Sequence, residues 1–285
     1  MTSIQAFFDT DTSTVTYLVW DPATQKAAII DPVLDYEPHA ARLNTTSADT
    51  VLAAAKEKSL EIEWVLETHA HADHLSAADY IRAKTGARVG IGEHITKVQK
   101  IFVPIFGADD VAPDGHVFDK LFADGETFEI GSMKIEVSHT PGHTPACISY
   151  LIEDAVFVGD TLFMPDYGTA RADFPGGDAA TLYQSIQKIL SLPANTRVFV
   201  GHDYLPEGRD KPAWETTVAQ QRESNRHVRQ GVSETEFVER RNARDATLAA
   251  PRLILPSLQV NIRAGAMPPK AENGETYLKI PVNRL

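Results

Sequence analysis

The sequence has only one cysteine, Cys147, among its 285 residues. A single thiol cannot form an internal disulfide bond, and this composition is typical of proteins from a reducing compartment. Apolar runs long enough to cross a membrane are also absent, so the sequence predicts no membrane-spanning helix. The first residues contain neither a basic segment nor a long apolar one, which argues against a signal peptide. Together these absences predict a cytoplasmic protein.

Positive charge is scarce. The chain has 27 Lys and Arg against 39 Asp and Glu, which gives a formal net charge of −12. Nucleic acids and anionic membrane surfaces attract proteins whose Lys and Arg are clustered. The composition therefore predicts that neither a nucleic acid nor a membrane is a partner of this protein. With 43% hydrophobic residues, the chain is long and apolar enough to bury a large core.

The most informative segment is residues 69–74, which read His-Ala-His-Ala-Asp-His. It directly follows the apolar run 62–66, which predicts a buried strand. Three imidazoles and one carboxylate within six residues at a strand end can all point at one ion. Neutral imidazole and carboxylate are ligands that zinc, iron and manganese share. The segment therefore indicates a metal site rather than a surface turn.

Three later runs of the strand type also end at a His or an Asp. Residues 135–137, 155–158 and 197–200 are apolar and rich in β-branched or aromatic residues, and Gly or Pro follows each of them. We expect the polar residues after these strands to join the first cluster at one edge of the fold. The resulting set of candidate ligands is His69, His71, Asp73, His74, His143, Asp160 and His202.

These residue types permit two chemistries. With two metals, one ion would be held by His69, His71 and His143, the other by Asp73, His74 and His202, and Asp160 would bridge them. A bridging hydroxide could then attack an acyl or phosphoryl centre. With one redox metal, two imidazoles and one carboxylate form the facial triad of non-haem iron(II) oxygenases, which leaves positions open for substrate and dioxygen. The spacing of the ligands does not choose between them.

The order His-x-His-x-Asp-His, then His, then Asp, then His resembles the metallo-β-lactamase superfamily over residues from about 14 to 205. The resemblance implies an α/β fold, an αββα sandwich of two mixed sheets with outer helices, and a metal site at one edge of the packed sheets. We treat residues 1–285 as one domain, with a core over about 1–205 and a helical and C-terminal appendage over about 206–285.

Local patterns predict the individual elements. Strands are expected at 4–8, 15–20 and 27–30, and a hairpin is expected over 126–130 and 133–137. Expected helices cover 49–58, 75–84, 181–192, 214–229 and 235–249, and a short strand is expected at 277–280.

A second, narrower resemblance lies in residues 164–178, which contain Gly-Thr-Ala-Arg-x-Asp-Phe after the earlier His-Thr-Pro-Gly-His-Thr-Pro. These motifs resemble the persulfide dioxygenases (sulfur dioxygenases) of the ethylmalonic-encephalopathy type, and the tail at 255–265 is similar to their bacterial branch of β-lactamase-like hydrolases. The resemblance implies one iron(II) per chain on His69, His143 and Asp160. The remaining candidates, which are His71, Asp73, His74 and His202, would then orient those ligands or hold water by hydrogen bonds.

The reaction that this resemblance implies converts glutathione persulfide, dioxygen and water to sulfite and glutathione, as in sulfide detoxification. Arg171 matches an arginine beside the family's metal site, so it is expected to bind substrate or to form an ion pair with Asp173. Tyr204 is expected to reach the substrate or to pack in the core. Asn261 and Arg263 are similar to a region that contacts glutathione in glyoxalase II enzymes, although the spacing differs. The resemblance also implies a homodimer.

Two rival functions remain open at this stage. The first is a binuclear hydrolase of the glyoxalase II type that cleaves a thioester such as S-lactoylglutathione, with two zinc ions or a mixed iron–zinc pair; ligand type alone does not separate iron from zinc. The second is a non-catalytic protein that binds metal without turnover. Two further residues have simpler expected roles: Cys147 as a buried, unreactive thiol and His139 as a structural imidazole.

Overall fold

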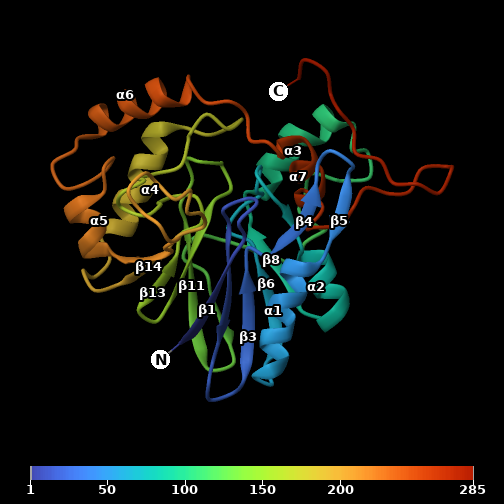
Figure 1. The fold of residues 1–285 in the computed structure, drawn as a ribbon, viewed down its shortest axis with the longest axis horizontal. Helices are drawn as coiled ribbons and strands as arrows, with labels where there is room; N and C mark the ends of the chain where they lie inside the picture. Colours follow the sequence, from blue (N-terminus) through green and yellow to red (C-terminus); the bar gives the residue numbers. More distant parts are fainter. Residues whose placement is uncertain (1, 285) are drawn as a thin grey trace.

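The computed structural model describes residues 2–284 of the chain, and two six-stranded sheets form its centre (Figure 1). The first sheet contains β1 (Ser3–Phe8), β2 (Val15–Trp20), β3 (Lys26–Ile30), β6 (Glu61–Leu66), β8 (Arg88–Gly92) and β9 (Lys120–Phe122), in that order. The second contains β10 (Thr127–Ile130), β11 (Met133–His139), β12 (Ile148–Ile152), β13 (Ala155–Phe157), β14 (Arg197–Phe199) and β15 (Glu215–Thr217). A small third sheet joins β5 (Arg42–Asn44), β4 (Val33–Glu37) and β7 (Leu75–Ser76).

The alternation of side chains along β2 shows why the two large sheets stack. Val15, Tyr17 and Val19 are buried against residues of the second sheet, while Leu18 points to the opposite face and packs in the other core. Successive side chains of a strand point to opposite faces, so a strand that is apolar on both faces must be covered on both. Tyr17 contacts Phe157 and Phe199 edge-on across this interface, with ring centroids 5.1 and 5.5 Å apart.

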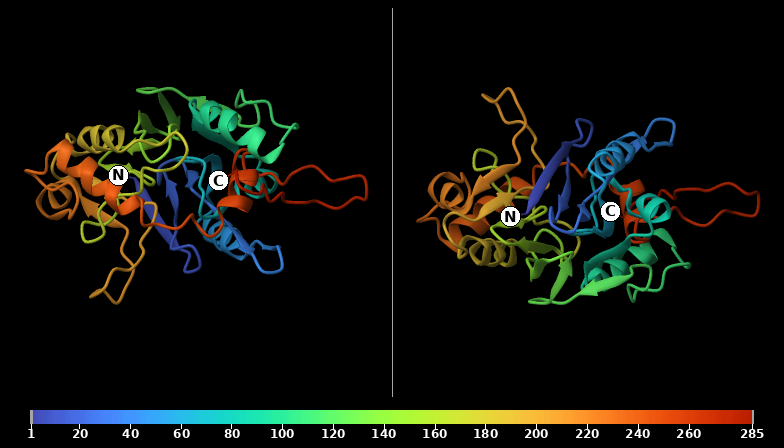
Figure 2. Two further views of the ribbon diagram at one scale, coloured as in Figure 1. Left: turned by 90° about the horizontal axis from the view of Figure 1, so that it is seen from above. Right: turned by 90° about the horizontal axis from the view of Figure 1, so that it is seen from below.

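Helices cover the outer face of each sheet (Figures 1 and 2). The first sheet is covered by α1 (Thr46–Glu57), α2 (Ala78–Thr85), α3 (Ile95–Phe106) and α7 (Ile254–Asn261). The second is covered by α4 (Ala179–Leu190), α5 (Val218–Ser224) and α6 (Glu234–Asp245). This arrangement, with parallel and antiparallel strand pairs in both sheets, is the predicted αββα sandwich. Within the part of the chain that the structure describes, no helix is long and apolar enough to cross a membrane.

Three predicted elements differ from the observed ones. The helix expected over 75–84 begins only at Ala78, because Leu75 and Ser76 pair with β4 as a short strand. The helix expected over 214–229 divides into β15 and the shorter α5, since Thr217 forms a capping box that starts the helix at Val218, four residues later than predicted. The run 277–280 forms no strand. Helix α7 was not predicted, although its Pro256 lies in the first turn, where proline is tolerated.

Candidate metal centre

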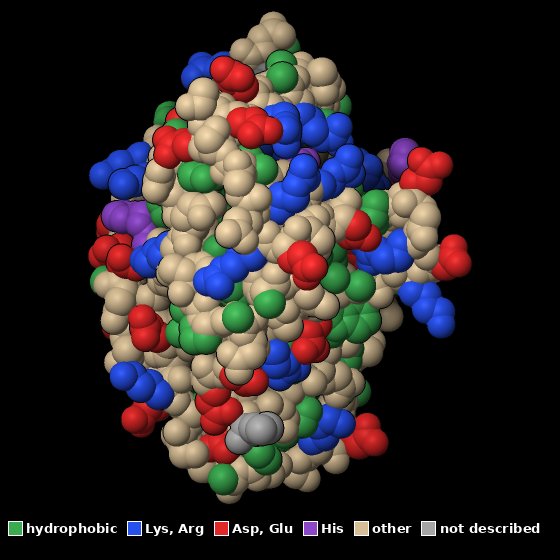
Figure 3. Space-filling view, turned by 90° about the vertical axis from the view of Figure 1, so that its left-hand side faces the viewer, with side chains coloured by type: hydrophobic (Ala, Val, Ile, Leu, Met, Phe, Trp, Pro, Cys, Tyr) green, Lys and Arg blue, Asp and Glu red, His purple; other side chains and the backbone are tan. Residues whose placement is uncertain are grey.

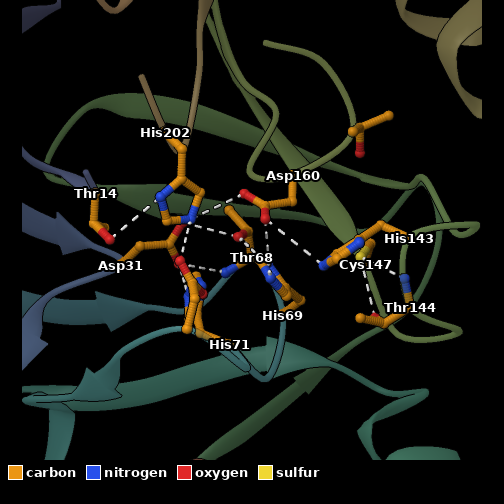
Figure 4. A network of polar contacts seen from close by, with 12 residues as sticks. Thr14, Asp31, Thr68, His69, His71, His143, Thr144, Cys147, Asp160 and His202 are labelled. Atoms are coloured by element: carbon orange, nitrogen blue, oxygen red, sulfur yellow. Dashed lines mark hydrogen bonds and ion pairs between the residues drawn. The ribbon is translucent and has the colours of Figure 1, made fainter. Parts of the chain in front are cut away.

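The predicted ligand residues meet at one edge of the sandwich, each on a loop that follows a strand. Figure 4 shows five of them close together, which are His69, His71, His143, Asp160 and His202. His69 and His71 follow β6, His143 lies between β11 and β12, Asp160 follows β13 and His202 follows β14. Ligand atoms within each of two groups lie within 4.8 Å of one another. One group is His69, His143 and Asp160, and the other is His71, Asp73, His74 and His202.

Two glycines allow the loops to approach this closely. Gly159, just before Asp160, has φ +48°, and a Cβ at this position would lie 2.4 Å from the Thr68 hydroxyl oxygen. Gly142, just before His143, has φ +132°, and a Cβ there would lie 2.3 Å from the backbone of Leu182. A side chain at either position would collide with these neighbours, so the two glycines allow the close approach and fix where the two following candidate ligands project.

Asp160 lies between the two groups. Its Oδ2 is 4.0 Å from His69 Nε2 and 3.7 Å from His143 Nε2. Its Oδ1 faces the other group, 3.3 Å from His202 Nε2, and His202 Nε2 is 3.1 Å from Asp73 Oδ2. A single buried carboxylate is therefore placed to contribute to either group or to bridge both.

Six buried polar atoms that face this centre have no hydrogen-bond partner among residues 2–284. Buried polar atoms are almost always paired in proteins, and leaving one unpaired costs about 1–3 kcal/mol. The concentration of such atoms here, all of them potential ligand atoms, fits a bound metal, whose identity and number the donor set leaves open. The unpaired atoms are His69 Nε2, His71 Nδ1, Asp73 Oδ2, His74 Nε2, Asp160 Oδ1 and His202 Nε2.

The opposite ring nitrogens are held by the protein. His143 Nδ1 lies 2.8 Å from the Arg171 carbonyl oxygen, and His74 Nδ1 lies 3.1 Å from the Leu75 carbonyl oxygen. A carbonyl only accepts, so each Nδ1 carries the hydrogen and each Nε2 presents a lone pair. Such outer contacts orient metal ligands and set their tautomer.

His71 is held differently, by two carboxylates. Its Nε2 is 3.1 Å from Asp31 Oδ1 and 3.2 Å from Glu67 Oε2, while its Nδ1 faces the centre. Asp31 also accepts hydrogen bonds from the backbone N–H and the hydroxyl of Thr68, at 2.7 and 2.8 Å, so it braces the loop. Burial alone would lower the pKa of His71, but the neighbouring Asp31 carboxylate raises it well above 6.5.

Burial keeps other imidazoles of the centre neutral. The pKa of His69 lies well below 6.5 because the ring is buried and several other imidazoles surround it. Burial and the nearby His71 lower the pKa of His74 to about 3. Metal ions bind the neutral form of histidine, so both rings are in the binding-competent form at neutral pH.

Arg171 and Tyr204 line a cavity of about 490 Å³ beside this centre, together with His143 and Asp160. The Arg171 guanidinium forms a bidentate ion pair with Asp173, at 2.5 and 2.6 Å, so the predicted ion pair is present. Tyr204 stacks on His202 with ring centroids 5.4 Å apart. Both residues therefore line the cavity and also contact other side chains of the protein.

Asn261 and Arg263 lie elsewhere, and neither lines the cavity. Asn261 donates to the carbonyl oxygens of His71 and His74, both at 2.8 Å, and accepts from the backbone N–H of Ser76. Arg263 forms a bidentate ion pair with Asp110. These contacts support a structural role for both residues, and the expectation that they bind substrate gains no support from them.

Two residues have the simpler surroundings that the sequence predicted. Cys147 is buried, which raises the pKa of its thiol to about 12. His139 belongs to neither ligand group; its Nε2 lies 3.1 Å from the Pro145 carbonyl oxygen.

Sequence reasoning missed one part of the cavity wall. His227 lines the cavity beside Arg226, Arg244 and Arg252. The high density of arginine between residues 222 and 252 was the available signal, but it does not reveal which side chains share a cavity.

A family model described as the metallo-beta-lactamase superfamily matches residues 9–202, a span that contains all the candidate ligands. The chain belongs to the metallo-beta-lactamase superfamily. Glyoxylase B2 of Dictyostelium discoideum is 52% identical over 99% of this chain and 97% of its own length. A probable metallo-hydrolase of Burkholderia pseudomallei is 49% identical, over 99% of this chain and 100% of its own.

More distant similarity connects the chain to persulfide dioxygenases. The mitochondrial persulfide dioxygenase ETHE1 of Bos taurus is 31% identical over 70% of this chain and 68% of its own length. The crystal structure of ETHE1 from Myxococcus xanthus superposes with a TM-score of 0.74 at 32% identity, and covers 93% of this chain and 100% of its own. The protein is thus a metallo-beta-lactamase superfamily enzyme, either a hydrolase or a dioxygenase.

Proposed function

We propose that this protein is a persulfide dioxygenase that holds one iron(II) on His69, His143 and Asp160. The observation that carries the proposal is the arrangement of these three residues, whose ligand atoms lie within 4.8 Å of one another beside the cavity. Two imidazoles and one carboxylate are the ligands of mononuclear iron oxygenases, which keep open positions for substrate and dioxygen. The similarity to ETHE1 of Bos taurus and Myxococcus xanthus supports the same assignment.

The surroundings of the second group suit a supporting role. His71 is tied to Asp31 and Glu67 through Nε2, and Glu67 also accepts a hydrogen bond from Ser76. His202 is close to Thr14 through Nδ1 and to Asp73 through Nε2. In the proposed enzyme His202 keeps Asp160 in position through the contact between its Nε2 and Asp160 Oδ1, and the other residues of the group hold water by hydrogen bonds.

The proposed reaction consumes one glutathione persulfide, one dioxygen and one water, and forms glutathione, sulfite and two protons. The terminal sulfur is oxidised, dioxygen is reduced and the sulfur–sulfur bond breaks. An iron(II) held by the triad would supply the redox chemistry and a positive charge for the persulfide anion. The protein's own contribution is the cavity: Phe163, Tyr167 and Tyr204 form an aromatic wall that limits access of water to the reacting sulfur.

A binuclear thioester hydrolase is the second candidate, and a specific observation favours it. The unpaired atoms extend beyond the triad to His71 Nδ1, His74 Nε2 and His202 Nε2, which together with Asp73 could hold a second ion. The names of two relatives, a metallo-hydrolase and a glyoxylase, point in the same direction. Asp160, with one oxygen toward each group, is suited to bridge two metals.

Two variants separate these functions when metal content per chain and persulfide turnover are measured together. Asp160→Ala removes the only carboxylate of the triad, so iron content and dioxygenase turnover should both be lost. His71→Ala should leave the iron content near one per chain in a mononuclear enzyme, whereas a binuclear enzyme should lose one metal. Retention of iron and full turnover by Asp160→Ala would refute the ligand assignment. Two metals per wild-type chain with thioester cleavage would favour the hydrolase.

A further inference from the structure

One part of the cavity wall is strongly basic, although the protein as a whole carries a net charge of −12. Arg226, His227, Arg244 and Arg252 all line the cavity that also contains Asp160. They come from the segment after α5, from α6 and from the loop before α7. On the face in Figure 3, Lys and Arg side chains gather in the upper part, over this helical region.

Neighbouring arginines differ in whether a carboxylate neutralises them. Arg241 is buried and paired with Asp245 at 2.6 Å, and Arg171 is paired with Asp173. The positive charges of these two arginines are compensated within the protein, so they attract a charged ligand only weakly.

The three exposed arginines of the wall lack such partners. Across residues 2–284, no ion pair is found for Arg226, Arg244 or Arg252. Arg226 Nη1 donates to the backbone oxygen of Asp166 and Arg252 Nη2 to that of Asp11, both at 3.3 Å, which leaves both guanidinium charges uncompensated. Unpaired guanidinium groups that share a cavity form a site for carboxylates, which they bind in a bidentate manner.

His227 adds a neutral donor to this group. Its Nδ1 accepts a hydrogen bond from the backbone N–H of Thr169 at 3.1 Å, so its hydrogen is on Nε2. Burial, followed by the charges of Arg241, Arg226 and other arginines, lowers the pKa of His227 to about 4. The ring is therefore neutral at pH 7, and its Nε2–H is available to an acceptor.

We infer that Arg226, His227, Arg244 and Arg252 form a subsite that binds the carboxylates of the substrate, away from its reacting sulfur. The substrate class is then a thiol derivative with remote carboxylates, of the glutathione type, rather than an inorganic or uncharged persulfide. A cavity of about 490 Å³ lies within the range of sites that hold ligands of this size. Naming the reacting group as a persulfide rests on the proposed function, whereas the carboxylate subsite itself does not.

The test is the binding of S-methylglutathione to the metal-loaded protein, measured by titration calorimetry. This probe keeps both carboxylates but has no free thiol, so its affinity reports the subsite and not coordination by sulfur. Arg226→Gln and Arg244→Gln should each weaken binding by about 5-fold or more. Arg229→Gln is the matched control, because Arg229 is exposed and nearby but does not line the cavity. It should bind within 2-fold of wild type, roughly the scatter of such a measurement.

A second ligand makes the test independent of the variants. The dimethyl ester of S-methylglutathione lacks both negative charges and should bind about 10-fold more weakly to the wild type. The inference is overturned if the ester binds as tightly as the acid, if wild type binds neither, or if the control variant loses as much affinity as Arg244→Gln. Intact binding of S-methylglutathione by a protein that takes up no oxygen with the persulfide would refute the proposed function and leave the carboxylate subsite. Oxygen uptake by a protein whose arginine variants bind S-methylglutathione as tightly as wild type would refute the subsite and leave the proposed function.

Discussion

His143 donates its Nδ1 hydrogen to the backbone carbonyl oxygen of Arg171 across 2.8 Å. The Arg171 side chain in turn binds Asp173 and donates to the carbonyl oxygen of Ala249 at 2.7 Å. One residue therefore orients a proposed metal ligand through its backbone and fastens its own loop to the segment after α6 through its side chain. The motif that resembled persulfide dioxygenases in sequence thus lies against the candidate metal centre.

The first prediction concerns this connection. Arg171→Ala and Asp173→Ala should each weaken iron binding by about 10-fold, because either change releases the loop that holds His143. The double variant should be no worse than Arg171→Ala alone, since Arg171→Ala already removes the ion pair with Asp173. Iron affinity is measured by competition with a chelator.

The control is Arg197→Ala, which breaks a similar ion pair with Glu215 at the start of β14, the end opposite His202, and should leave the iron affinity unchanged. A KM for the persulfide that rises much more in Arg171→Ala than in Asp173→Ala would contradict this purely positioning role. It would show instead that the guanidinium contacts the substrate.

The candidate ligands could be grouped from the sequence because each lies in a segment that follows an apolar strand, and strand ends at one edge of a sandwich lie close together. The contact between Asn261 and His71 could not be predicted, because the two residues are 190 positions apart in the sequence and no local pattern reports such a contact. The same reason explains His227: burial and the nearby arginines keep its ring neutral, and the backbone N–H of Thr169, distant in sequence, sets its tautomer.

A second prediction follows from the position of Asn261. Asn261→Ala leaves the carbonyl oxygens of His71 and His74 and the N–H of Ser76 without their partner, in a buried site. We expect the free energy of unfolding to fall by about 2–4 kcal/mol. Urea denaturation of the metal-free protein measures it, and the exposed Asn242→Ala on α6 serves as the control.

If Asn261 instead contacted glutathione, Asn261→Ala would keep wild-type stability and raise only the KM for the substrate. That result would restore the role expected from the sequence.

A third prediction concerns pH. The pKa of His227 is about 4 in the folded protein, below the value of about 6.5 expected in the unfolded chain. Between these values the unfolded chain binds the extra proton, so stability contributed by this residue is present above pH 6.5 and is lost as the pH falls toward 4.

The variant His227→Asn should reduce this loss, since its side-chain oxygen can accept the hydrogen bond from Thr169 without titrating. Urea midpoints at pH 7.5 and 5 are compared in the same metal state. The control variant His39→Asn changes an exposed histidine, and its urea midpoint should fall between pH 7.5 and 5 as steeply as that of wild type. Equal declines for all three proteins would contradict the burial and charge environment assigned to His227.

The proposed function requires that iron held by His69, His143 and Asp160 supports the oxidation of a persulfide by dioxygen. It is tested most directly by oxygen uptake of the iron-loaded protein after addition of glutathione persulfide, with sulfite measured in the same sample. The proposed dioxygenase should take up oxygen rapidly and form one sulfite per dioxygen consumed. The variant Asp160→Ala should show neither oxygen uptake nor sulfite. No uptake by protein with confirmed iron, together with cleavage of S-lactoylglutathione, would contradict the proposed function and identify a hydrolase.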